Sequence, residues 1–233
     1  MDALAFVCAM PMELRPLSKR LGLTAVTVRG VRLRSGTLDG RPVVALATGM
    51  GPTVATQSTA RLLDAADVDR VLVFGITGAV DDVTPIGAVV HPALVVDGET
   101  GAEHRPDRLG GPEPAGTMWT TDRITRPAEL PALRARGVVC LDMETAAIAA
   151  SCERQAIPWS VHRAISDRAT DGSVDDEVFH LSHPDGTPDH RAVAAYLLRH
   201  PQRIPGLVRM AKGARLATER AAHAAIAAAR TVR

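Results

Sequence analysis

The chain has 233 residues, of which 46% are hydrophobic and only 3% aromatic. A chain of this length buries enough surface to form a core without disulfides or metals. The formal net charge of +1 gives no electrostatic reason to expect a nucleic acid or an anionic membrane as partner. No run approaches 18 apolar residues, so we expect no membrane span.

The elements predicted in the first half of the chain alternate between strands and helices. The apolar run over residues 4–10 predicts a buried strand, and residues 12–22 predict a helix that ends at Gly22. Residues 31–48 predict a hairpin around the "LDGRP" turn. A helix opened by Thr53 and a second buried strand follow over residues 53–66 and 69–76.

In the second half, residues 87–98 predict more strand, and residues 98–116 predict a long loop rich in Gly and Pro. Residues 138–156 begin extended and become a helix, and residues 157–166 predict another strand. The helical pattern from Arg191 to Arg233 is broken at "RHPQRIPG". The chain shows no repeat or linker, so we expect one α/β domain over residues 1–233 with a central sheet.

The cysteines and the N-terminus indicate the compartment. Cys8, Cys140 and Cys152 lie in apolar stretches and form no CxxC pair, which is typical of buried free thiols in a reducing environment. Asp2 stands where a signal peptide would be basic, and Pro11 ends the apolar run. We therefore expect a cytoplasmic protein. The Arg-rich C-terminal stretch is interpreted as a helix with a solvated face.

Candidate site residues stand where strands give way to helices, which is where α/β sheets place their sites. The "GMG" turn at Gly51 does not complete GxGxxG, so it is either a tight turn or a close approach to a ligand. Glu144 is either a helix N-terminal acid or an acceptor for hydroxyl groups such as those of a sugar. Ser166 and Asp167 are either N-caps or an acid held at the sheet edge to move a proton.

The segment "HLSHPDGTPDH" over residues 180–190 contains three histidines and two aspartates. No two of these histidines are one helical turn apart with a third ligand nearby, and Pro and Gly indicate a loop. We expect no metal and no organic cofactor. His162, within a predicted strand, is interpreted as a core or interface histidine.

Four segments together resemble the nucleoside phosphorylase superfamily, closest to the 5′-methylthioadenosine/S-adenosylhomocysteine nucleosidases. They occur in the family's order and are "CAMPMELRPL", "TGMGPTVATQSTARLL", "VFGITGAVDDVTPIGAVV" and "LDMETAAIAASCERQAIPWSVHRAISD". The last is the most specific, because its two motifs have the family's mutual spacing. The resemblance implies a three-layer α/β/α sandwich with a central mixed sheet, a small-molecule nucleoside substrate and a homodimer.

Carried over by position, the resemblance assigns roles to individual residues. Asp167 matches the general acid that protonates or hydrogen-bonds N7 of the departing purine, with Ser166 orienting it. Glu13 matches the carboxylate that activates water. Glu144 matches the acceptor of the ribose hydroxyls, and Met143 the residue against the ribose.

The resemblance assigns further positions to the site, and some of them depart from the family pattern. Gly51 and Gly78 belong to the glycine turns, and Ile76 stands where the family has a serine. Ile124, followed by Thr125, stands where an aromatic usually stacks on the purine, and Phe179 aligns loosely with the 5′ pocket. These departures put the preference for the base and the 5′ group in doubt.

Three alternatives to a methylthioadenosine-type hydrolase stay open. A phosphorylase would need inorganic phosphate, and Arg15 lies close to Glu13 in sequence. The C-terminal segment also resembles the hopanoid-associated branch, which acts on adenosylhopane. A non-catalytic nucleoside-binding protein would tolerate the loss of Asp167, whereas the set Glu13, Glu144 and Asp167 is intact.

Overall fold

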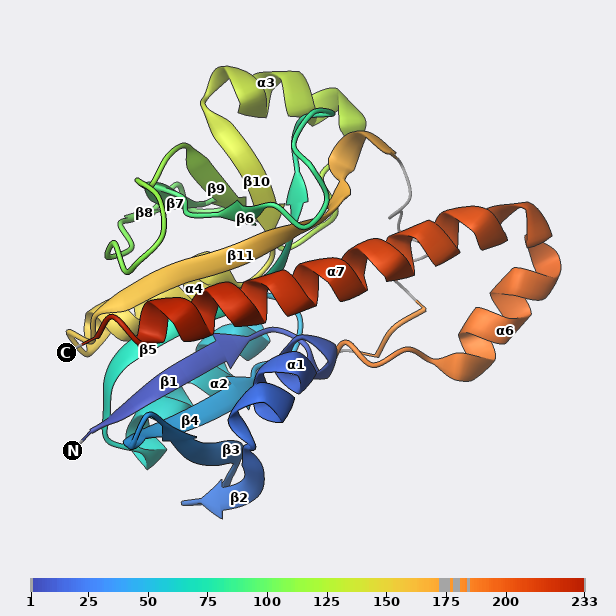
Figure 1. The fold of residues 1–233 in the computed structure, drawn as a ribbon. Helices are drawn as coiled ribbons and strands as arrows, with labels where there is room; N and C mark the ends of the chain where they lie inside the picture. The colour runs from blue at the N-terminus through green and yellow to red at the C-terminus, as the bar shows by residue number, and fades with distance from the viewer. Residues whose placement is uncertain (1, 172–176, 178–180, 184, 233) are drawn as a thin grey trace.

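A computed structural model describes residues 2–171, 177, 181–183 and 185–232 and forms a sheet with helices on both faces (Figure 1). The centre of the sheet is β1 (Ala3–Cys8), which pairs in parallel with β4 (Arg41–Ala47) and β5 (Val68–Ala79). The long β5 also pairs in parallel with β11 (Trp159–Arg168), and its last residues pair antiparallel with β10 (Val138–Asp142). The ends of these strands therefore converge.

The remaining strands complete the mixed sheet, whose order along its main path is β2-β3-β4-β1-β5-β10-β9-β7-β8, with β11 and β6 branching from β5. Antiparallel pairs occur at both ends, between β2 and β3 and between β7 and β8. Their bounds are β2 Thr24–Val28, β3 Val31–Leu38, β6 Val89–Val90, β7 Leu94–Asp97, β8 Glu103–His104 and β9 Thr117–Thr120.

Helices cover the two faces of the sheet. One face carries α1 (Pro11–Leu21) and α7 (Ile204–Ala229), and the other carries α2 (Pro52–Ala65) and α4 (Thr145–Arg154). The short α3 (Leu130–Ala135) follows a 3-10 turn over Pro127–Glu129. Two further 3-10 turns cover Ala169–Asp171 and Pro201–Arg203, and α6 (His190–Arg199) precedes the last of them. The expected three-layer α/β/α sandwich with a mixed sheet is confirmed.

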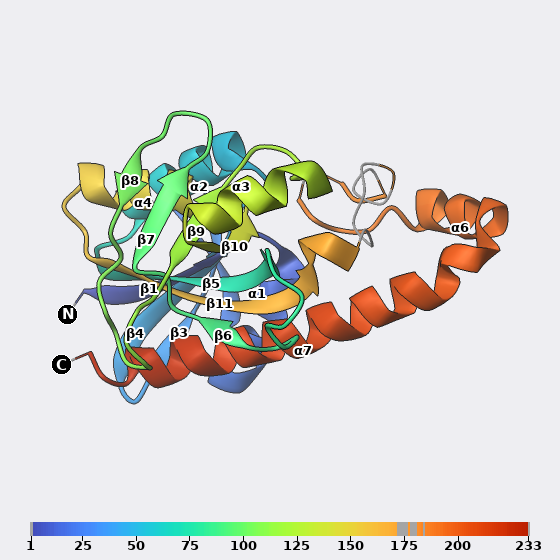
Figure 2. The same ribbon diagram turned by 90° about the horizontal axis from the view of Figure 1, so that it is seen from above.

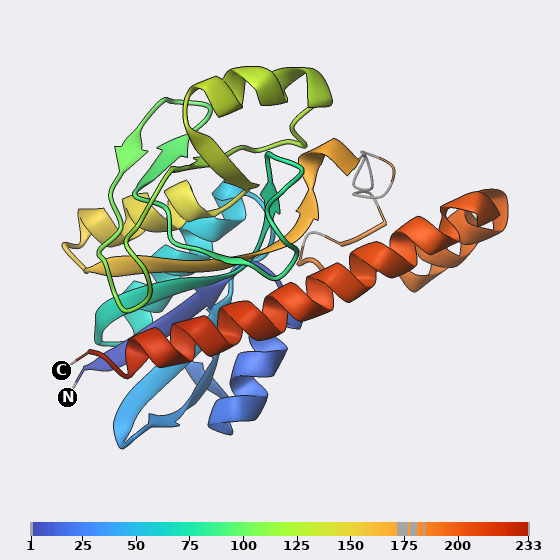
Figure 3. The same cartoon turned by 45° about the horizontal axis from the view of Figure 1, so that its top comes forward.

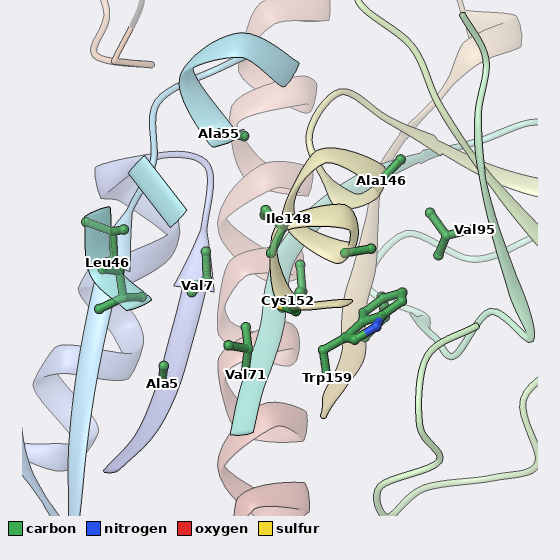
Figure 4. Packing of buried hydrophobic residues seen from close by; sticks show 14 of the residues in the cluster. Ala5, Val7, Leu46, Ala55, Val71, Val95, Ala146, Ile148, Cys152 and Trp159 are labelled. Carbon is green, nitrogen blue, oxygen red and sulfur yellow. The ribbon is translucent and has the colours of Figure 1, made fainter. Parts of the chain in front are cut away.

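Side chains that alternate along β1 build two separate cores. Ala3, Ala5 and Val7 pack with α2 and α4, while Leu4, Phe6 and Cys8 pack with α1 and α7. A strand buried on both faces must be apolar throughout, as β1 is. Figure 4 shows the first core, in which Val7 and Val71 of the sheet lie near Ile148 and Cys152 of α4.

Several local predictions are confirmed and others are shifted. The hairpin turns at Asp39–Gly40, and all three cysteines are free and buried. The helix expected from Thr53 begins at Pro52, because proline is favoured in the first helical turn. The expected loop over residues 98–116 contains the two-residue strand β8, paired with β7.

The C-terminal helices extend beyond the body of the molecule. The second half of α7 packs on β11 and β5, whereas α6 and the first half of α7 project away from the sheet (Figures 2 and 3). Within the described part of the chain, no helix is long and apolar enough to cross a membrane.

Candidate active site

A cavity of about 260 Å³ opens where β1, β5, β10 and β11 end. Because parallel strands present their carboxyl ends at one edge, side chains that are distant in sequence meet there. Nine of the eleven expected site residues line it: Glu13, Ile76, Gly78, Ile124, Thr125, Met143, Glu144, Ser166 and Asp167.

The other two expected residues have different outcomes. Gly51 does not line the cavity, but its backbone N–H donates a 3.0 Å hydrogen bond to Oε1 of Glu144. Gly51 has a φ of 92°, which confirms the interpretation of the "GMG" turn as a tight turn that needs glycine, while the close approach of a ligand to it stays a prediction. Phe179 lies outside the described residues.

Glu13 is held rigidly at the start of α1. Its Oε2 accepts hydrogen bonds from the N–H groups of Ala9 (2.9 Å) and Met10 (2.7 Å), and its Oε1 accepts one from Ile76 (2.7 Å). Each carboxylate oxygen has two lone pairs, so these bonds leave one acceptor position on Oε1. Burial raises the pKa of Glu13, although Arg163 and the three donors lower it. Glu13 is therefore an oriented base that is stronger than an exposed carboxylate.

Gly75 of β5 lets the backbone approach this carboxylate. Its φ is 139°, and a Cβ there would lie 2.3 Å from Glu13 Oε1. We expect Gly75→Ala to displace the Glu13 carboxylate, and to lower both the melting temperature and the activity. Gly137→Ala is the matched control, since Gly137 also has positive φ but has open space around it. Equal activity of the two variants would contradict this role for Gly75.

Arg163 of β11 is the centre of the charge network. Its side chain is 1% exposed, and its Nη2 lies 2.7 Å from Asp142 Oδ2 and 3.5 Å from Glu144 Oε2. Nη1 donates to the carbonyl oxygen of Ile76 (3.0 Å) and lies 3.8 Å from Glu13 Oε1. One guanidinium thus faces three buried carboxylates, which links the segments that carry Glu13 and Glu144.

Asp142 connects this network to the start of α4. Its Oδ1 accepts a 2.6 Å hydrogen bond from the Thr120 hydroxyl, and its Oδ2 accepts from the N–H and hydroxyl of Thr145. Asp142, rather than Glu144, therefore caps the first N–H of the helix. Glu144 does stand at the N-cap position of α4, as expected of a helix N-terminal acid, but its side chain makes no capping hydrogen bond and is turned to the cavity and the network instead.

Glu144 has an unusual environment for a carboxylate. Burial raises the pKa of Glu144 to about 7, with Arg163 acting against this shift and the Asp142 charge reinforcing it. Near neutral pH this side chain can therefore exchange a proton while accepting the Gly51 N–H. Such a group can hydrogen-bond a hydroxyl as acceptor or donor.

The raised pKa of Glu144 predicts how stability depends on pH. The folded state binds the proton more tightly than the unfolded state, whose carboxyl titrates near 4.5. The contribution of the Glu144 proton to the free energy of unfolding is therefore full below about pH 4.5 and is lost as pH rises to about 7. We expect the free energy of unfolding of the wild type minus that of Glu144→Gln to decrease across this interval in urea titrations. A difference that stays constant would contradict the raised pKa.

Asp167 lies near the end of β11, not at a helix start. Ile165 pairs with Thr77 and Asp167 with Gly78, so Ser166 is the extra residue of a bulge. Bulges re-aim side chains at sheet edges. The Ser166 hydroxyl donates a 2.5 Å hydrogen bond to Asp167 Oδ1 and also lies 3.4 Å from the carbonyl oxygen of Thr77. The interpretation of both residues as N-caps is wrong, because the structure places them in the strand.

Residues that the sequence analysis did not assign to the site also line the cavity. Arg163 is the one Lys, Arg, Asp or Glu in the run predicted as a strand over residues 157–166, and that was the available signal. Met10 and Met50 flank the glycine and proline turns, and only folding shows that they face the same cavity. Arg123 lines it too, with both outer guanidinium nitrogens bound to Glu129.

Comparisons with known proteins place this site in context. Residues 3–115 and 102–199 match the sequence profile of the phosphorylase superfamily. The chain is 30% identical, over 201 residues, to a 5′-methylthioadenosine/S-adenosylhomocysteine nucleosidase of Anoxybacillus flavithermus, covering 71% of this chain and 85% of that protein.

Solved structures share the fold. The nucleosidase of the same name from Neisseria meningitidis, in complex with methylthio-immucillin-A, has a TM-score of 0.73 at 19% identity, covering 98% and 100% of the two chains. A futalosine hydrolase of Helicobacter pylori has a TM-score of 0.72 at 14% identity, covering 97% of each. The chain thus shares its architecture with this nucleosidase and this hydrolase. The sequence match covers most of the chain, and the chain belongs to the phosphorylase superfamily.

Proposed function

We propose that this protein is a nucleosidase that hydrolyses the N-glycosidic bond of 5′-methylthioadenosine or S-adenosylhomocysteine-type nucleosides and releases adenine. The observation that carries the proposal is the meeting of Glu13, Glu144 and Asp167 in one cavity, from three separate segments of the chain. The 30% identical relative bears the corresponding name.

The reaction needs an acid and a base in different environments. Cleavage of an N-glycosidic bond develops positive charge on the ribose, and the departing purine leaves more readily when it gains a proton. Asp167, oriented by Ser166 at the strand end, donates that proton to N7. Glu13, buried and fixed by three backbone donors, accepts a proton from water through its remaining position on Oε1. Such division of roles between two carboxylates is a recurring solution.

Glu144 and the methionines bind the rest of the nucleoside. Glu144 accepts hydrogen bonds from the ribose hydroxyls, and Met143 lies against the sugar. Met10, Met50 and Met143 all line the cavity, and their flexible thioethers suit an apolar 5′-thio substituent. Ile124 and Thr125 provide an aliphatic wall for the purine in place of an aromatic stack.

Hydrolysis is favoured over phosphorolysis by the charges of the site. Arg15, the arginine that left a phosphorylase open, is exposed and does not line the cavity. Of the arginines that do line the cavity, Arg123 is bound to Glu129, and Arg168 donates to the carbonyl oxygen of Thr84. Arg163 is already shared among three carboxylates, so a phosphate placed beside Glu13 would be repelled by the charge of that carboxylate. Water carries no such penalty.

Glu13→Gln tests this assignment. In phosphate-free buffer we expect wild-type protein to release adenine from 5′-methylthioadenosine and S-adenosylhomocysteine, and Glu13→Gln to lower kcat by about 10²–10⁴-fold. Glu113→Gln, which changes an exposed carboxylate, is the control and should match the wild type. Thermal unfolding of each variant separates lost chemistry from lost folding. Unchanged kcat in a folded Glu13→Gln protein would overturn the role of Glu13.

We further propose that residues 1–233 form one domain, that two copies associate as a homodimer and that the protein works in the cytoplasm. The single continuous sheet supports the first and the three buried free thiols support the last. The dimer rests on the family resemblance, and light scattering of the purified protein tests it.

A further inference from the structure

The basic residues of the chain are unevenly distributed. Residues 190–216, which comprise α6, the following 3-10 turn and the first half of α7, are here named the C-terminal arm. The arm contains no Asp or Glu and carries six cationic side chains: Arg191, Arg199, Arg203, Arg209, Lys212 and Arg215. Taking these six from the 27 lysines and arginines of the chain leaves 21 against 26 acidic residues, a net charge of −5. The total of +1 therefore conceals a basic arm on an acidic body.

The arm also exposes apolar side chains. None of the residues of α6 is buried, and the buried residues of α7 begin only at Ala217. Leu198 is 85% exposed, and Ile204, Val208 and Leu216 are also exposed. Isolated exposed leucines are ordinary, but here four large apolar side chains share one acid-free segment. The arm projects away from the sheet, so an extended partner can reach it (Figures 2 and 3).

One side of the arm faces a cavity of the protein itself. A second cavity of about 770 Å³ lies between α7 and the end of β11, and Leu207, Met210 and Gly213 line it from the helix. These residues recur every three positions and so share one face of α7. Ile204, Val208 and Arg215 are exposed, whereas Leu207, Met210 and Gly213 are half-buried. Arg203, Arg209, Lys212 and Leu216 also line this cavity, although Arg209, Lys212 and Leu216 stay exposed. The residues left for a partner away from the cavity are Ile204, Val208 and Arg215 of α7, together with Arg191, Leu198 and Arg199 of α6.

We propose that the C-terminal arm binds the surface of an anionic lipid bilayer, with its exposed side in the headgroup layer. Helices that combine lysine and arginine with exposed leucine, isoleucine and valine lie in this interface, where the cations meet lipid phosphates and the apolar groups enter the acyl boundary. Clusters of four to eight basic residues suffice for electrostatic attraction to anionic lipids. The acidic body is repelled by the same surface, so the arm is the part that makes contact.

A second copy of the chain is the competing partner, because its body is acidic. Several surface carboxylates of the body, however, already have basic partners within the described part of the chain. The pairs are Asp39–Arg230, Asp69–Arg41, Asp107–Arg70, Glu113–Arg108, Glu129–Arg123, Glu153–His104 and Glu219–Arg20. A bilayer of anionic lipids offers unpaired negative charge at higher density, which favours it.

Vesicle co-sedimentation tests the proposal on the full chain. The vesicles contain phosphatidylcholine alone or phosphatidylcholine with phosphatidylglycerol, at low and at high salt. The arm variant is Arg191→Glu, Arg199→Glu and Arg215→Glu, three exposed residues that line neither cavity. The matched control is Lys19→Glu, Arg32→Glu and Arg34→Glu, which makes the same change of charge on exposed positions of the body. Leu198→Glu separately tests the apolar contribution.

We expect the wild type and the body control to bind the anionic vesicles. The arm variant should bind them at least tenfold more weakly than the wild type. Leu198→Glu should also bind more weakly than the wild type. High salt should release all four proteins from the vesicles. Adenine release in solution should be equal in all four. Absence of vesicle binding, equal binding to neutral vesicles, or equal loss in both charge variants would overturn the proposal. Self-association of the wild type that the arm variant loses, without vesicle binding, would instead identify a second copy as the partner.

Discussion

Asp167→Asn should lower kcat for adenine release by about 10²–10⁴-fold, because an amide can hydrogen-bond N7 but cannot give it a proton. The substitution preserves the shape of the side chain at the bulge, where the Ser166 hydroxyl can still reach the amide oxygen. KM should change much less than kcat, since proton donation matters in the transition state and not in binding. Initial rates with 5′-methylthioadenosine measure both parameters.

The control for this prediction is a substrate that needs no acid. In p-nitrophenyl 5-methylthioriboside the p-nitrophenolate leaves without protonation. Asp167→Asn should therefore cleave this substrate nearly as well as the wild type. Asp185→Asn, an exposed aspartate outside both cavities, should match the wild type on both substrates. Equal losses on the two substrates would indicate that Asp167 supports the structure of the site and is not the acid.

Arg163→Met should destabilise the protein by about 3–5 kcal/mol, the typical cost of removing one partner from a buried ionic network. The side chain is 1% exposed and faces Glu13, Asp142 and Glu144, which would be left without their shared cation. Methionine fills similar volume, so the loss reports charge more than packing. Urea unfolding at neutral pH measures it.

Two further variants test the cause of the Arg163 effect. Adding Glu144→Gln to Arg163→Met removes one of the uncompensated carboxylates, so the double variant should lose less stability than the sum of the single losses. Arg108→Met breaks an exposed pair with Glu113 and should cost no more than about 1 kcal/mol. Strict additivity of Arg163→Met and Glu144→Gln would contradict the coupling inferred from their geometry.

Much of the fold could be predicted from short-range patterns. The apolar run of β1 indicated a strand buried on both faces, and the "LDGRP" turn indicated the β3–β4 hairpin. The roles of Glu13, Glu144 and Asp167 came from motif resemblance, and the structure brings these three residues to one cavity. Their roles in the reaction stay predictions until measured.

Other features depend on contacts between distant segments and could not be predicted. Arg163 is separated by 21 residues from Asp142 and by 150 from Glu13, so only the packing of β11 beside β5 reveals the network. Ser166 and Asp167 are equally good helix caps and strand-end residues in sequence, and the bulge decided between them. The helical pattern of α6 and α7 does not indicate what each helix packs against. The sequence therefore could not predict that the arm projects from the body.

The most direct test of the proposed function is the identity of the sugar product from 5′-methylthioadenosine. Purified protein is incubated with the substrate in the absence and in the presence of saturating inorganic phosphate, and the products are identified by mass spectrometry. If Glu13 and Asp167 catalyse hydrolysis, adenine and free 5-methylthioribose form at the same rate with and without phosphate. Adenine release that requires phosphate, with 5-methylthioribose 1-phosphate as the product, would contradict the assignment of Glu13 to water.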